Sequence, residues 1–156
     1  MPIFLKKPSR RRNTLLFASA THVWSDLAYA LTVPLLPLIQ SDPKLLLTYT
    51  QVGLLRSVFN GASAILQIPA GFLAEQLGEF WLLIGGNIWV AAGIIGMAAA
   101  SSYFVLLLIT FIGGLGGSTQ HPLATSMVSR AYDDAGRSTA VGTVNFAGDL
   151  GKLAAP

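Results

Sequence analysis

The chain has 156 residues, of which 53% are apolar and 11% are charged, and its formal net charge is +3. Because soluble globular proteins contain about 25% charged residues, this chain has too little charge to cover a surface that faces water, which indicates a membrane protein. The positive charge is concentrated in one N-terminal run, which argues against a nucleic-acid partner, and the absence of cysteine excludes disulfides and thiolate chemistry.

Long apolar stretches predict helices that cross the lipid bilayer. A helix needs about 20 residues to cross a hydrocarbon core about 30 Å thick. Residues 1–13 are predicted to be a basic cytoplasmic tail, and residues 14–156 an incomplete transmembrane bundle. The predicted fold class is therefore an all-α membrane protein with four complete transmembrane helices and the start of a fifth. The predicted spans are residues 14–40, 49–74, 80–100, 103–128 and 138–156.

The distribution of lysine and arginine predicts the orientation of these spans. Both residue types are retained on the cytoplasmic side of a bacterial membrane. With the N-terminus inside, only Lys44 among the cations of the tail and the linkers faces outward. We therefore expect an integral protein of a bacterial inner (plasma) membrane with a cytoplasmic N-terminus. The cations that then lie inside are Lys6, Lys7, Arg10, Arg11, Arg12, Arg130 and Arg137.

A signal peptide is the main alternative for the first span. A basic start, the apolar residues 15–17 and the small residues on either side of Tyr29 imitate one. However, His22, Ser25 and Asp26 interrupt what should be a continuous apolar stretch, and three further spans follow. We therefore interpret residues 14–40 as a transmembrane helix.

Six ionisable residues lie within the predicted spans, where each charge costs at least about 2.5 to 3.5 kcal/mol at a helix centre. From the helical rise, Asp26 lies about 18 Å from the cytoplasmic end of its span and Arg56 about 10 Å from the outer end of its own. These depths nearly coincide, and they predict one outer layer that also contains Asp149 and Lys152. His22 and His121 are expected to form an inner, titratable layer, with His121 near the cytoplasmic end. The six residues are His22, Asp26, Arg56, His121, Asp149 and Lys152.

Each of these groups also has a purely structural interpretation. Any single pair can be a static ion pair that locks two helices together, since buried pairs are weak evidence of mechanism. His121-Pro122 can mark a kink, as can Pro34, Pro37 and Pro69. The whole set favours a substrate or proton pathway, because charges at shared depths occur together with histidines that change protonation state near physiological pH.

The linker between the second and third spans, residues 71–80, is similar to a signature of the major facilitator superfamily. In that family the signature reads Gly, two apolar-leaning positions, Ala, Asp, Arg, any residue, Gly, Arg, and Arg or Lys. Here Glu75 replaces the Asp, and none of the three basic positions carries a cation. The resemblance implies a cytoplasmic gate motif at Gly71, Glu75 and Gly78 that lacks its usual positive charges.

The resemblance to this superfamily covers about residues 14–156. The motifs Thr21-His22 with Asp26, 34–37 and His121-Pro122 are most similar to the fosmidomycin-resistance-like branch of drug exporters. Thr110 stands where the fourth span of the family often has an arginine. The fifth span resembles a glycine-rich pattern associated with antiporters through Gly142, Asn145, Gly148 and Gly151.

The resemblance implies a partial N-terminal bundle of a major facilitator fold, in which two six-helix halves enclose a substrate near the midplane. The missing C-terminal half would then be a partner. The expected function is a secondary active transporter of a small organic solute or drug, proton-coupled and acting in efflux. Asp26 and His22 would handle protons, Arg56 and Lys152 would pair with acids or substrate, and Asn145 would make a polar contact. No cofactor is expected.

Two other functions remain open at this stage. A non-transporting scaffold or assembly subunit would fit the missing gate cations. An intramembrane enzyme would use His22 or His121 as a base or a metal ligand. It needs an opposed nucleophile or a clustered ligand set, and two histidines on separate helices at different depths supply neither. We therefore expect neither an enzyme nor a metal site.

Overall fold

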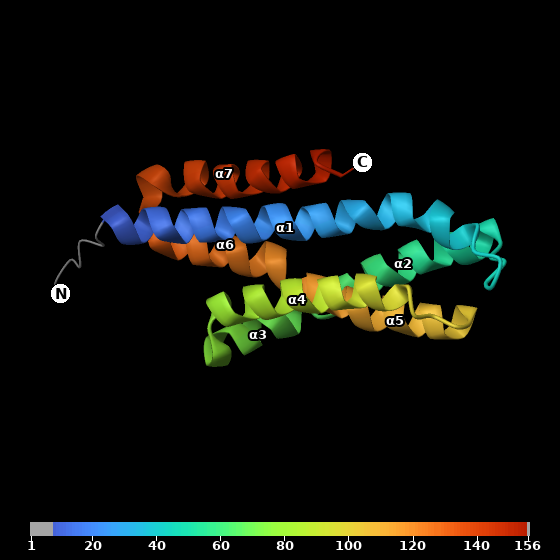
Figure 1. The fold of residues 1–156 in the computed structure, drawn as a ribbon. Coiled ribbons are helices and arrows are strands. Elements are labelled where there is room, and N and C mark those ends of the chain that lie inside the picture. The colour runs from blue at the N-terminus through green and yellow to red at the C-terminus, as the bar shows by residue number, and fades with distance from the viewer. Residues whose placement is uncertain (1–7, 156) are drawn as a thin grey trace.

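The computed structural model describes residues 8–155, apart from the side chains of Pro8, Ser9 and Ser118. Within that range every regular element is a helix. Figure 1 shows an elongated bundle in which the start of α1, the α3–α4 corner and the α6–α7 corner point toward the same end. The elements are α1 (Pro8–Gln40), α2 (Tyr49–Ile65), α3 (Gln67–Leu77), α4 (Glu79–Met97), α5 (Tyr103–Leu115), the 3₁₀ turn η1 (Gly116–Thr119), α6 (Gln120–Ala131) and α7 (Asp134–Leu153).

Apolar side chains lie on the outside of the bundle and polar side chains are buried inside it, which is the reverse of the pattern in a soluble protein. Large apolar side chains such as Trp81 and Phe146 are exposed, whereas His22, Asp26 and Gln120 are almost completely buried. Within residues 8–155, three helical segments are long and apolar enough to cross a membrane, or four if α2 and α3 form one broken span. Because lipid solvates an apolar exterior, these observations describe an integral membrane protein.

Helix α1 begins earlier than predicted. It includes residues 8–13, so this part of the predicted basic tail is helical, while Lys6 and Lys7 lie outside the described residues. Pro34 and Pro37 lie inside the helix, which continues to Gln40. The 33 residues of α1 are enough to cross a bilayer and extend beyond its hydrocarbon core at about 1.5 Å per residue.

The predicted second span, 49–74, is broken rather than continuous. A capping box formed by Thr48 and Gln51 starts α2, and the axis then bends by 44° between α2 and α3. The break lies at Leu66, directly after Ile65. Pro69 explains its position, because proline has no N–H and its ring clashes with the carbonyl four residues earlier, which belongs to Ile65.

The predicted fourth span, 103–128, is also interrupted. The 3₁₀ turn η1 separates α5 from α6, and α6 continues to Ala131. Pro122 cannot donate a helical hydrogen bond to residue 118, so the predicted kink falls within this turn. Gly116 permits a close approach there, since an added Cβ would lie 2.8 Å from the carbonyl oxygen of Gly86 on α4.

Helix α7 begins four residues before the predicted fifth span and lies along α1 (Figure 1). Two glycines make this packing close: an added Cβ on Gly151 would overlap the Val23 backbone, and one on Gly148 would overlap Asp26 and His22. Small residues at such contacts let helix backbones approach each other in membranes. Helix α7 is not among the helices that are long and apolar enough to cross a membrane. Its role as a fifth span therefore stays a prediction.

Buried apolar residues form separate clusters along the bundle, and polar residues are buried between them. The cluster near the α6–α7 corner consists of Ala18, Leu83, Leu123, Ala124, Val128, Ala140 and Val144. The cluster at the opposite end consists of Leu47, Leu55, Met97 and Leu106. A small middle cluster contains Ala28, Phe59 and Val90. The buried Asp26 lies on α1 between Ala18 of the first cluster and Ala28 of the middle cluster.

Candidate functional site

Asp26 lies at the centre of a charged cluster that joins α1 to α7. Its Oδ2 atom is 3.2 Å from Nζ of Lys152 and 3.5 Å from Nε2 of His22. His22 and Asp26 are four residues apart, so they share one face of α1. Lys152 also lies 2.9 Å from Oδ1 of Asp149 on its own helix. One lysine therefore bridges a buried acid on α1 and an exposed acid on α7.

His121 belongs to the same cluster. Its ring lies edge to face against the ring of His22, with 4.9 Å between the ring centroids. One ligand atom from each of His22, Asp26 and His121 lies within 4.8 Å of the other two. We predicted an inner layer with the two histidines and an outer layer with Asp26. This prediction is wrong, because both histidine side chains lie close to the Asp26 carboxylate. The two histidines do not lie at different depths, and together with Asp26 they form a clustered ligand set. The prediction that they cannot do so is therefore wrong.

Sequence reasoning missed the buried polar groups that support this cluster. The Gln120 side chain, 1% exposed, donates through Nε2 to Oγ1 of Thr21 at 3.4 Å. Asn87 on α4 donates to the carbonyl of Thr21 at 3.3 Å. Thr21 and Gln120 each directly precede one of the histidines, and that adjacency was the available signal. These bonds connect α1, α4 and α6 around the histidine pair.

Arg56 does not join the charged cluster, contrary to the predicted layer. Its guanidinium donates to the hydroxyl of Thr32 and, at 3.3 Å, to the carbonyl of Tyr29. Among the described residues it forms no ion pair with an acid. Thr32 lies six residues after Asp26, about 9 Å farther along α1. Arg56 therefore belongs to a second polar site closer to the C-terminal end of α1, which includes the hydrogen bond from Tyr29 to Ser63.

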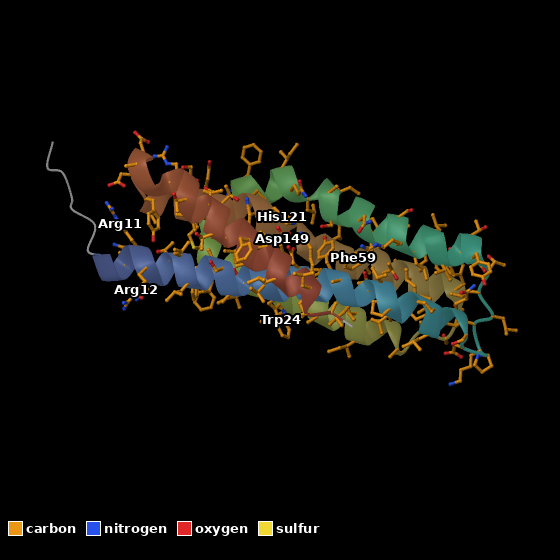
Figure 2. The ribbon with its side chains drawn as sticks, turned by 90° about the horizontal axis from the view of Figure 1, so that it is seen from above. Arg11, Arg12, Trp24, Phe59, His121 and Asp149 are labelled. Atoms are coloured by element: carbon orange, nitrogen blue, oxygen red, sulfur yellow. The ribbon has the colours of Figure 1, made fainter. Side chains whose placement is uncertain are left out.

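Helix α7 presents two different exposed stripes beside the face that packs on α1. Asn145 and Asp149 are exposed and lie four residues apart, on one polar stripe. Phe146 and Leu150 are exposed and form an apolar stripe beside it. Figure 2 shows Asp149 and His121 midway along the bundle, while Arg11 and Arg12 lie at the N-terminal end of α1. Of the charged groups of α7, Asp149 thus lies midway along the bundle.

The predicted gate motif lies at the α3–α4 corner. Gly78 makes this corner with a φ of +82°, which favours glycine, and Glu75 is exposed nearby. Sequence reasoning missed an ion pair between Glu79, at the start of α4, and Arg130, at the end of α6. The Glu79 side chain is only 9% exposed. This pair joins the α3–α4 corner to the α6–α7 corner. Its acid, Glu79, occupies a position where the family signature has an arginine.

Comparisons with known proteins agree with this architecture. The family model of the Major Facilitator Superfamily matches residues 18–156. The chain is 28% identical over 138 residues to the Fosmidomycin resistance protein of Escherichia coli (strain K12), covering 88% of this chain and 33% of that protein. It is 27% identical over 144 residues to the uncharacterized MFS-type transporter YfnC of Bacillus subtilis (strain 168), covering 91% and 34%.

A third relative is the probable nitrate transporter NarT of Staphylococcus carnosus (strain TM300). It is 30% identical to the chain over 105 residues, which cover 67% of this chain and 25% of that protein. The chain thus spans about a third of the length of the first two relatives and a quarter of the third.

Proposed function

The chain belongs to the major facilitator superfamily, and we propose that it is the N-terminal part of a secondary active transporter for a small organic solute or drug. In such transporters two bundles rock about a substrate site near the bilayer midplane. The complete protein would supply the second bundle, in line with the greater length of the relatives. Its membrane would be a bacterial inner membrane, with the basic end of α1 in the cytoplasm.

The observation that carries this proposal is the position of Lys152 between Asp26 and Asp149. A buried carboxylate inside a membrane is costly unless it is paired or protonated. Protonation of Asp26 would weaken its pairing with Lys152, while Lys152 would keep Asp149 as a partner. The lysine would then be available to an anionic group of the solute. This exchange would couple proton movement to solute movement, with His22 and His121 beside the carboxylate.

Other residues have proposed roles in the same pathway. Arg56 offers a second cation in its polar site, and Asn145 offers an exposed amide on the polar stripe of α7. One relative is named for resistance to fosmidomycin and another as a probable nitrate transporter, so both compounds are candidate solutes. Gly71, Glu75 and Gly78 would form the cytoplasmic gate, with the Glu79–Arg130 pair supplying the charge contact that the missing cations do not.

A transport assay on the intact protein in proteoliposomes tests this proposal. Fosmidomycin and nitrate are the two probes, and each is followed with and without an imposed pH gradient. We expect the gradient to drive flux of one probe. Asp26→Asn should lose most of the gradient-driven flux but keep solute exchange at equal pH, because the variant cannot release a proton. Asp42→Asn, in the outer linker, is the matched control and should behave as the unsubstituted protein.

Two outcomes would contradict the proposal. Unchanged gradient-driven flux in Asp26→Asn would remove this residue from coupling. No flux or exchange of either probe by the well-folded, intact protein would favour the alternative of a scaffold or assembly subunit, which fits the absence of the usual gate cations.

A further inference from the structure

We propose that His22, Asp26 and His121 form a binding site for one divalent transition-metal ion of the zinc class. Two imidazoles and one carboxylate are ligands that suit Zn²⁺ and Co²⁺. This inference does not depend on the transport proposal, because it concerns only the binding of a metal ion to three side chains.

The geometry of the cluster is close to that of a three-ligand site. His22 and Asp26 project from one face of α1, and His121 comes from the start of α6, directly after the η1 turn. The three ligand atoms lie within 4.8 Å of one another. In a tetrahedral zinc site with ligands about 2.0 to 2.2 Å from the ion, the ligand atoms lie about 3.3 to 3.6 Å apart. Nε2 of His22 and Oδ2 of Asp26 are already 3.5 Å apart, so the site closes when the exposed His121 ring moves toward them.

On α7, a glycine faces the ligand atoms of Asp26 and His22. An added Cβ on Gly148 would lie 2.6 Å from Oδ2 of Asp26 and 2.8 Å from Nε2 of His22, so any larger residue there would cover the ligand atoms. His22 is 3% exposed, and neither of its ring nitrogens makes a hydrogen bond of normal geometry within residues 8–155. The backbone of Val144 also lies near the ring. The site thus contains buried nitrogen atoms whose capacity to bind a ligand is largely unused.

Lys152 is the cation that an incoming metal ion would displace from Asp26. Its ammonium already has a second acceptor, because Oδ1 of Asp149 lies 2.9 Å away. Lys152 can therefore leave Asp26 without losing all of its partners. Three protein ligands leave at least one coordination position of a zinc-class ion open to water or to an anion.

Cobalt titration of the intact protein, purified without a polyhistidine tag, tests this site. The visible absorption of bound Co²⁺ reports its ligands, and displacement by Zn²⁺ reports competition for the same site. His22 and His121 are the two histidines of these 156 residues, which contain no cysteine, so the substitutions below separate this site from metal ligands elsewhere in the intact protein. Loss of an outer-shell partner alone changes metal affinity by about 10–100-fold, so His22→Asn, Asp26→Asn and His121→Asn should each weaken binding by at least about tenfold. Lys152→Met should strengthen it, and the exposed Asp134→Asn should leave it unchanged.

The exposed position of His121 keeps the test decisive. If a variant at the buried His22 fails to fold, His121→Asn still reports the site, and its folding is checked by circular dichroism. Unchanged Co²⁺ affinity in His121→Asn, or no saturable binding by the unsubstituted protein, would overturn the proposal. If the protein transports a probe but binds no metal ion, only the metal site is rejected. If it binds a metal ion but transports neither probe, only the proposed function is rejected.

Discussion

Gly148→Ala is expected to lower the free energy of unfolding by about 1–3 kcal/mol, the usual cost of overpacking a close contact. The added Cβ would lie 2.6–2.8 Å from atoms of Asp26 and His22, well inside normal contact distance. Because both side chains are buried on α1, either they must be displaced from their present packing or α7 must shift away from α1. Chemical unfolding in detergent, followed by circular dichroism, measures this loss.

Gly142→Ala is the matched control on the same helix. An added Cβ there meets nothing within 4 Å, and alanine favours a helix over glycine by up to about 1 kcal/mol. We therefore expect this variant to be as stable as the unsubstituted protein or slightly more stable. Equal destabilisation by the two substitutions would show that glycine at position 148 has no special packing role and would contradict the close contact between α1 and α7.

Lys152→Met is expected to destabilise the protein by about 1–3 kcal/mol. Removing one partner of a fully buried ion pair costs about 3–5 kcal/mol, but the Lys152 side chain is 53% exposed, which reduces the effect. Asp26, with a side chain only 3% exposed, would be left as a buried carboxylate without its lysine. Unfolding in detergent at neutral pH measures the difference.

The double variant Asp26→Asn/Lys152→Met separates the two parts of this cost. It removes the buried charge together with its partner, so much of the lost stability should return. Arg137→Gln is the matched control, since its exposed pair with Asp134 is also an i,i+3 pair on α7 and should change stability by less than about 1 kcal/mol. A double variant that is no more stable than Lys152→Met would mean that Asp26 does not depend on the lysine.

The membrane helices were predictable from the sequence because the exterior of a membrane protein must be apolar over a fixed length. The third predicted span, 80–100, corresponds closely to α4, Glu79–Met97. The breaks in the second and fourth spans were not placed by hydropathy, since a bent helix has the same composition as a straight one. Pro69 and Pro122 marked both regions, but proline inside α1 caused no break, so proline alone does not decide the outcome.

The depth of His121 was misjudged for a physical reason. Counting about 1.5 Å per residue from a boundary at Val128 placed it near the cytoplasmic end. Helix α6 continues to Ala131, which adds three residues, or about 4.5 Å, between His121 and the end of the helix. This extension moves His121 away from that end and toward the level of Asp26. Boundaries and turn type are set by tertiary contacts, such as Gly116 against α4, that one sequence does not reveal.

The partners of Arg56 and Glu79 were also not predicted from the sequence. Arg56 was matched with Asp26 by height, but a helix residue has a direction around the axis as well as a height, and the long guanidinium reaches Thr32 instead. Glu79 was considered only as a replacement in the gate motif. Its partner Arg130 lies 51 positions away in the sequence, and only the fold brings the two corners together.

We infer that the charged cluster and the polar stripe of α7 face an interior that water reaches, while the apolar stripe faces lipid. Asn145 and Leu150 test it directly, because they lie about 140° apart around the helix. The chain contains no cysteine, so each replacement introduces one thiol into it. In membrane vesicles, a hydrophilic thiol reagent should modify Asn145→Cys readily and leave Leu150→Cys largely unmodified. Equal modification of both, or faster modification of Leu150→Cys, would contradict the claim.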